Sequence, residues 1–109
     1  MIAQRIRLPN RRLNESLAFT CNGLRYIASF GSFENGDLAE VFLGNSKAGS
    51  HSDAAAKDSA IICSLALQFG VPLDAIRHAL LHDSQGNASS PLGVALDLYA
   101  ATRPIDDAA

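Results

Sequence analysis

The sequence contains no tryptophan, one methionine and two cysteines, and aromatic residues make up only 6% of its 109 residues. A core with so few aromatic side chains must be built mainly from alanine, leucine and isoleucine, and a surface on which nucleic-acid bases stack is not expected. No apolar run approaches the roughly 20 residues that span a bilayer, and the first residues do not form a signal peptide, so we expect a cytoplasmic protein. Cys21 and Cys63 lie far apart without C-x-x-C spacing and are expected to be reduced and buried.

A specific catalytic motif is also absent. The sequence has no G-x-S-x-G elbow, and no pattern places two carboxylates in a cleft. Residues 44–49 have the glycine spacing of a phosphate-binding P-loop, but Ser50 and His51 stand where that loop requires lysine and serine or threonine. His78 and His82 lie four apart on a predicted helix and could share a metal ion, but no further ligand follows at a recognisable spacing. We therefore expect exposed histidines, no bound metal and no cofactor.

The composition is that of a globular protein, with 48% hydrophobic and 18% charged residues. We expect one domain over residues 1–104, with a basic arm over residues 1–13 and a frayed tail over residues 105–109. Four arginines give the first twelve residues a charge of +4, while five basic and eleven acidic residues give the remainder −6. Such an arm is expected to contact phosphate or an acidic partner surface, or else to pair with the domain's own carboxylates.

The order of the predicted elements indicates an α+β fold. Residues 16–21, 24–33 and 38–43 have the composition and alternation of strands, and Asn22-Gly23 is a strong hairpin signal. Residues 52–69, 72–81 and 91–101 are predicted to be helices. We therefore expect an antiparallel β-meander of three or four strands, packed on one face by three helices. The first helix is apolar most of the way round, and its helical spacing predicts that Ile62, Leu65, Ala66 and Phe69 are buried.

Two polar loops precede predicted helices and are candidates for binding an anion. Ser50 and Ser90 are each placed to cap a helix, and Pro91 suits the first helical position. The N-terminus of a helix favours negative charge, and the arginines of the arm would add to it. We expect a single surface for an anion or a partner, formed by Arg11, Arg12, Lys47, Ser50, Asn87, Ser89 and Ser90.

Several short motifs, taken in order, resemble one known family. They are Arg7-Leu8-Pro9-x-Arg11-Arg12, Ala39-Glu40-Val41-Phe42-Leu43, Lys47-Ala48-Gly49-Ser50, Arg77-x-Ala79-Leu80 and Asp83-Ser84-x-Gly86-Asn87-Ala88-Ser89-Ser90-Pro91-Leu92-Gly93. Together they resemble the TSCPD domain, which occurs at the C-terminus of adenosylcobalamin-dependent (class II) ribonucleotide reductases and in small free-standing proteins. The family is named for a Thr-Ser-Cys-Pro-Asp motif, which here reads Ala88-Ser89-Ser90-Pro91-Leu92. The resemblance therefore carries over the Ser-Pro helix start but no role for a cysteine.

The resemblance implies a non-catalytic accessory or interaction module related to vitamin B12-dependent ribonucleotide reductase. Its partner would be a protein such as the reductase, or a phosphate-bearing ligand such as a nucleotide. Binding to a membrane is not expected. The alternative is a small enzyme or redox helper that acts with a ribonucleotide reductase. The sequence leaves open which ligand or partner is bound, and whether the chain forms a homo-oligomer.

Overall fold

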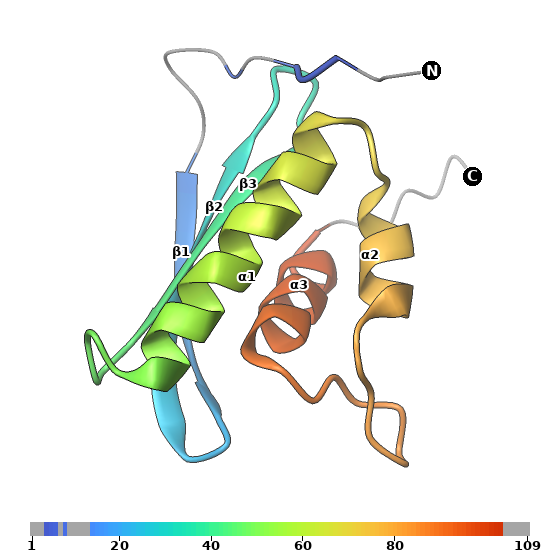
Figure 1. Ribbon diagram of the computed structural model, residues 1–109. Coiled ribbons are helices and arrows are strands. Elements are labelled where there is room, and N and C mark those ends of the chain that lie inside the picture. The colour runs from blue at the N-terminus through green and yellow to red at the C-terminus, as the bar shows by residue number, and fades with distance from the viewer. Residues whose placement is uncertain (1–3, 7, 9–13, 104–109) are drawn as a thin grey trace.

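A computed structural model of the chain describes residues 4–6, 8 and 14–103 (Figure 1). The elements are β1 (Asn14–Cys21), β2 (Leu24–Ser32), β3 (Leu38–Asn45), α1 (His51–Gln68), α2 (Leu73–Ala79) and α3 (Pro91–Ala101). The strands form an antiparallel sheet in the order β1-β2-β3. The helices α1 and α3 lie on one side of this sheet, and α2 packs beside α3. The expected α+β fold is confirmed, and in the described residues the meander has three strands.

Local sequence signals account for the hairpin between β1 and β2. Asn22 and Gly23 both have positive φ, at 52° and 79°, as the two central residues of a tight hairpin turn require. This turn fixes the register, so that Cys21 pairs with Leu24 and every second residue of β2 faces the helices. Its inward residues Tyr26, Ala28 and Phe30 are all buried. The alternation of apolar and polar residues along β2 therefore corresponds to the core face of the sheet.

The expected signals also delimit α1. The Ser50 hydroxyl accepts a hydrogen bond from the Asp53 N–H at 3.2 Å and caps the first turn. At the other end, Gly70 has φ of 95° and its N–H bonds to the Leu67 carbonyl, while the Val71 N–H bonds to the Ala66 carbonyl. These two bonds form a Schellman motif, for which glycine is the favoured residue.

Polar side chains of α1 cover the free edge of β3. The Ser64 hydroxyl accepts a hydrogen bond from the Val41 N–H at 2.8 Å and lies 3.1 Å from the Val41 carbonyl oxygen. The buried Gln68 amide donates to the Ala39 carbonyl at 3.1 Å. The backbone groups of an edge strand otherwise remain unpaired and can template aggregation. These two polar residues of α1 therefore face the sheet, where they satisfy backbone groups of β3.

This arrangement overturns the predicted buried face of α1. Ile62 is 68% exposed, Phe69 42% and Leu65 39%, and Ala66 is only partly buried. The apolar residues of α1 that are buried are Ala56, Ala60, Cys63 and Leu67. The prediction was wrong because helical spacing alone does not show that Ser64 and Gln68 bond to the edge of β3. Turning the helix to meet that edge leaves Ile61, Ile62 and Leu65 exposed.

Removing the Ser64 hydroxyl should destabilise the fold. We expect Ser64→Ala to lower the free energy of unfolding by about 1–3 kcal/mol, because the Val41 N–H loses its acceptor in a part-buried place. Ser59→Ala is the matched control, since the Ser59 hydroxyl bonds only to the Ala56 carbonyl within the same helix. Urea unfolding of the two variants measures the difference, and equal losses in both would contradict the role assigned to Ser64.

Candidate functional site

The loop before α1 is organised by a carboxylate of the chain itself. Asp53 is 1% exposed, and its two oxygens accept hydrogen bonds from the Asn45 N–H at 2.9 Å and the Gly49 N–H at 3.0 Å. The Lys57 ammonium group lies 2.8 Å from the same carboxylate. Bonding to Lys57, and then to the two backbone N–H groups, lowers the pKa of Asp53 to about 2. Asp53 therefore supplies the negative charge that this helix start favours.

Two of the predicted site residues belong to this loop. Ser50 is part-buried and its hydroxyl is engaged by the Asp53 N–H. Lys47 is exposed, and its backbone N–H donates to the Asn45 side-chain oxygen at 2.9 Å. The Lys47 side chain thus lies at the surface, while much of the backbone around it is bonded internally.

A second aspartate organises the loop before α3 in the same way. One oxygen of Asp83 accepts the N–H groups of Gln85 and Asn87, both at 2.9 Å. The Ser90 hydroxyl accepts the Gly93 N–H at 3.1 Å and caps α3, with Pro91 in the first turn as expected. The remaining predicted residues of this loop, Asn87 and Ser89, are exposed.

A Cβ atom at Gly93 would lie 2.9 Å from the Ala88 side chain, so the first turn of α3 packs closely on this loop. Glycine at this position is explained by that close approach. The first turn of α3 therefore packs directly against the loop that precedes it.

The two loops lie at the same end of the molecule. In Figure 1, α1 and α3 both begin at the lower end, with the loop before α1 on the left and the loop before α3 on the right. Within the described residues, no hydrogen bond or ion pair connects residues 45–50 with residues 82–90. Arg11 and Arg12 lie outside the described residues. A single surface combining the arm with both loops stays a prediction.

His78 and His82 do not lie on one helix, which a shared metal ion at this spacing would require. The helix α2 ends at Ala79, so His82 lies beyond it in an isolated bridge with Ala88. His78 is exposed, and its Nδ1 atom lies 3.0 Å from the Asp74 carbonyl oxygen. Over the part of the chain that the structure describes, no three histidine, cysteine or acidic residues are grouped to hold a metal ion.

We expect a chelator to leave the melting temperature of the protein unchanged. A structural zinc ion contributes a large share of the folding free energy of a small domain, so its removal would be obvious. Thermal unfolding with and without EDTA checks this, with His78→Ala as a companion variant. A large fall in melting temperature with EDTA that is reduced in His78→Ala would contradict this expectation.

Both cysteines are buried as expected, and neither is suited to nucleophilic chemistry. Cys21 is 8% exposed and Cys63 3%. Burial raises the pKa of both thiols, and that of Cys63 to about 11. A reactive cysteine requires a lowered pKa and access to solvent, and these side chains have neither.

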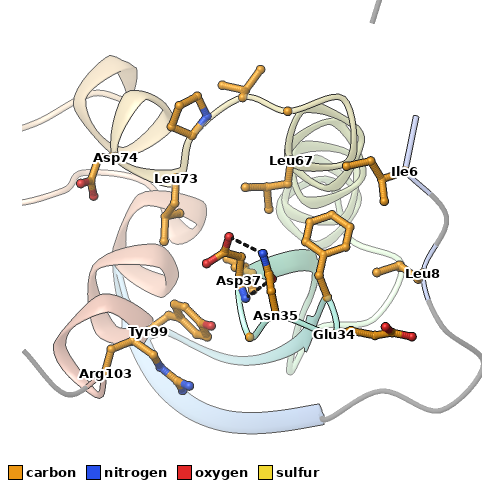
Figure 2. Close-up of a pocket in the computed structure, with 16 residues that line it drawn as sticks. Ile6, Leu8, Glu34, Asn35, Asp37, Leu67, Leu73, Asp74, Tyr99 and Arg103 are labelled. Atoms are coloured by element: carbon orange, nitrogen blue, oxygen red, sulfur yellow. Dashed lines mark hydrogen bonds between the residues drawn. The ribbon is translucent and has the colours of Figure 1, made fainter. Parts of the chain in front are cut away.

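A pocket of about 900 Å³ lies where the C-terminal end of α1 meets the β2–β3 turn and the last turn of α3 (Figure 2). Leu67, Leu73 and Tyr99 form much of its inner wall, and Ile6 and Leu8 border it on the far side. The segment that carries Ile6 is bonded to α1, because the Ile6 N–H donates to the Gln68 carbonyl at 2.8 Å. No sequence pattern predicts this pocket, because its walls come from four separate parts of the chain.

The polar groups of the pocket suit binding rather than covalent chemistry. The carboxylates of Glu34, Asp37 and Asp74 lie along it, and Asp37 accepts a hydrogen bond from the Asn35 amide at 3.0 Å. Arg103 lies 4.2 Å from the Tyr99 ring centre and pairs with Glu15. None of the described residues that line the pocket is a cysteine, histidine, serine or lysine.

Several large apolar side chains are exposed on α1 and at its C-cap. We define its outer face as Ile61, Ile62, Leu65 and Phe69, which are between 39% and 68% exposed. Leu65 lies three or four residues from the two isoleucines and four from Phe69, so the four side chains share one side of the helix. The chain continues from Phe69 into Val71, which is 40% exposed and lines the pocket. The outer face and the pocket thus meet at the C-terminal end of α1.

Comparison with known proteins relates the chain to one enzyme. A stretch of 71 residues is 37% identical to part of the vitamin B12-dependent ribonucleotide reductase of Agrobacterium fabrum (strain C58 / ATCC 33970). The match covers 65% of this chain and 6% of the reductase, so the chain spans only a small part of that relative. No family model matches the chain, and no solved structure matches it. None of the helices in the described residues is long and apolar enough to cross a membrane.

Proposed function

We propose that this chain is a non-catalytic interaction module of the TSCPD type, which docks onto a vitamin B12-dependent ribonucleotide reductase in the cytoplasm through the outer face of α1. The observation that carries the proposal is the exposure of Ile61, Ile62, Leu65 and Phe69 along one side of a helix. Contiguous apolar surface of this kind is typical of a protein-binding site.

The relation to a reductase supports the choice of partner. In the Agrobacterium protein the matching stretch is one part of a much longer chain, of which it is 6%. A segment carried within a large protein has neighbouring surfaces against which an apolar helix face can pack. We infer that this chain uses the same face to pack against a reductase.

Two features of the structure disfavour the alternatives. A redox helper needs an accessible thiol of low pKa, whereas Cys21 and Cys63 are buried and their pKa values are raised. Binding of a phosphate or nucleotide at the two loops would compete with Asp53 and Asp83, which already accept several of the backbone N–H groups there. Docking through α1 requires no such displacement.

The proposal is tested by titrating the full chain with a purified vitamin B12-dependent ribonucleotide reductase. Biolayer interferometry at two salt concentrations measures the dissociation constant. We expect a dissociation constant in the micromolar range or tighter. It should depend little on salt, because the proposed contact is apolar.

Two further measurements on the same protein sample test the alternative functions, which are anion binding and a redox role. Calorimetry with phosphate and ATP should show no heat of binding, and a thiol reagent should react only once the protein is unfolded. Binding of phosphate that is lost in an Arg11→Ala/Arg12→Ala variant would favour the anion site, and a fast-reacting thiol in the folded state would favour a redox helper.

A further inference from the structure

The two edges of the sheet differ in what covers their outward backbone groups. At β3, Ser64, Gln68 and Asp53 of α1 bond to the outward backbone groups of Val41, Ala39 and Asn45. At the opposite edge, β1 is the terminal strand of the sheet, and in the described part of the chain no strand lies on its outer side.

The register identifies the backbone groups of β1 that face outward. Cys21 and Leu24 flank the two-residue turn and form a hydrogen-bonded pair, so alternate residues of β1 bond to β2. The others direct their N–H and C=O groups away from the sheet; they are Asn14, Ser16, Ala18 and Thr20, and all four are exposed. The described stretch of β1 contains no proline or lysine, which are common protective residues of edge strands.

We infer that β1 pairs with β1 of a second copy of this chain, in antiparallel orientation, to form a continuous six-stranded sheet. The strand is self-complementary about Leu17. In that register Asn14 lies opposite the partner copy's Thr20 and Ser16 opposite its Ala18, so all four outward residues form hydrogen-bonded pairs. Every side chain in these pairs is small and neutral.

The other side of the strand also favours this register. Glu15, the only charged residue of β1, lies opposite Phe19 of the second copy rather than opposite another carboxylate. Leu17 meets its own counterpart at the two-fold axis. Leu17 and Phe19 pack against the core but are only partly buried, and a neighbouring strand would cover them further. A two-fold arrangement of this kind is closed and does not extend into a fibre.

The inference does not depend on docking through α1, since β1 and the outer face of α1 are different surfaces. Analytical ultracentrifugation of the full chain at about 10–100 µM should show a dimer, as expected for a micromolar interface. We expect Ala18→Pro to weaken dimerisation by at least about 100-fold, because it removes an outward N–H while leaving the bonds to β2 intact. The control Ala18→Thr keeps the N–H group and should remain a dimer.

Cross-linking tests the register. In the proposed pairing the two Leu17 residues form a non-hydrogen-bonded pair with Cα atoms about 4.5 Å apart, a distance that suits a disulfide. Leu17→Cys should therefore form a covalent dimer with oxidised glutathione as the oxidant. Thr20→Cys should not, because its counterpart lies six residues along the strand, about 20 Å away.

Three results would overturn the inference. One is a wild-type chain that is monomeric across this concentration range. Another is a dimer that Ala18→Pro leaves intact but Ile62→Asp dissociates, since that would place self-association on α1. The third is efficient cross-linking of Thr20→Cys without cross-linking of Leu17→Cys.

Discussion

Replacing Asp53 by asparagine should cause the greatest loss of stability of any single substitution described above, larger than that of Ser64→Ala. The carboxylate holds the loop before α1 through the N–H groups of Asn45 and Gly49, and it pairs with Lys57. An amide of the same shape turns one acceptor into a donor, which then faces another donor in a buried place. Thermal unfolding followed by circular dichroism measures the effect.

Asp83→Asn is the matched control for this prediction. Asp83 also accepts two backbone N–H groups, but both bond to a single oxygen, and the residue lies in an exposed loop. The oxygen of an asparagine can keep both bonds and water can solvate its amide group, so we expect a change within about 1 kcal/mol. Comparable losses in the two variants would show that burial does not set the importance of Asp53.

The ionisation of Asp53 also predicts how stability depends on pH. Its pKa is about 2 in the folded protein, below the usual 3.8 of aspartate, chiefly because of the bond from Lys57. A lowered folded-state pKa means that the contribution to stability is present above about pH 4 and is lost as the pH falls towards 2. The Asp53→Asn variant should lack this part of the acid dependence. An unchanged acid profile in the variant would assign the dependence to other carboxylates.

A second large effect is expected at the outer face of α1. The double variant Ile62→Asp/Leu65→Asp should weaken binding to the reductase by at least about 100-fold. Burying a large aliphatic side chain contributes about 1.5–3 kcal/mol, and each factor of ten in affinity corresponds to about 1.4 kcal/mol. A carboxylate buried without a partner at the same place adds a further penalty.

The stability of this double variant should change little, because Ile62 and Leu65 are 68% and 39% exposed in the free chain. Leu81→Asp is the control, since Leu81 is 77% exposed but lies outside α1. It should bind the reductase like the wild type. Equal losses of affinity in both variants would indicate a general effect of added negative charge.

Much of the fold could be predicted because its signals are local. Asn22-Gly23 specifies a tight turn between two alternating segments, and Ser50 and Ser90 cap the helices that follow them. Gly70 ends α1 with a left-handed backbone. Each of these features depends on residues a few positions apart, so the sequence pattern contains the relevant information.

The orientation of α1 could not be predicted in the same way. The helix is apolar most of the way round, so its periodicity does not distinguish one side from another. The choice is made by Ser64 and Gln68, which bond to the backbone of β3 more than twenty residues earlier. A polar residue inside an apolar helix is usually assigned to solvent, whereas here it marks the side that packs against a strand edge.

The candidate site was only partly accessible from the sequence for a related reason. Ser50 and Ser90 were identified from their positions before helices, but the pattern did not show that Asp53 and Asp83 fill those loops. The pocket brings Leu67 and Tyr99 together with the β2–β3 turn, and none of these segments is close to the others in sequence. Tertiary packing creates such a site, and no short motif encodes it.

Side-chain footprinting of the full chain with hydroxyl radicals, in the presence and absence of the reductase, shows which side chains the reductase covers. We expect Ile61, Ile62, Leu65 and Phe69 to become protected when the reductase is added, while Leu81 reacts as before. Binding that leaves these four side chains as reactive as in the free protein, or that protects the loops around Lys47 and Asn87 instead, would contradict docking through the outer face of α1.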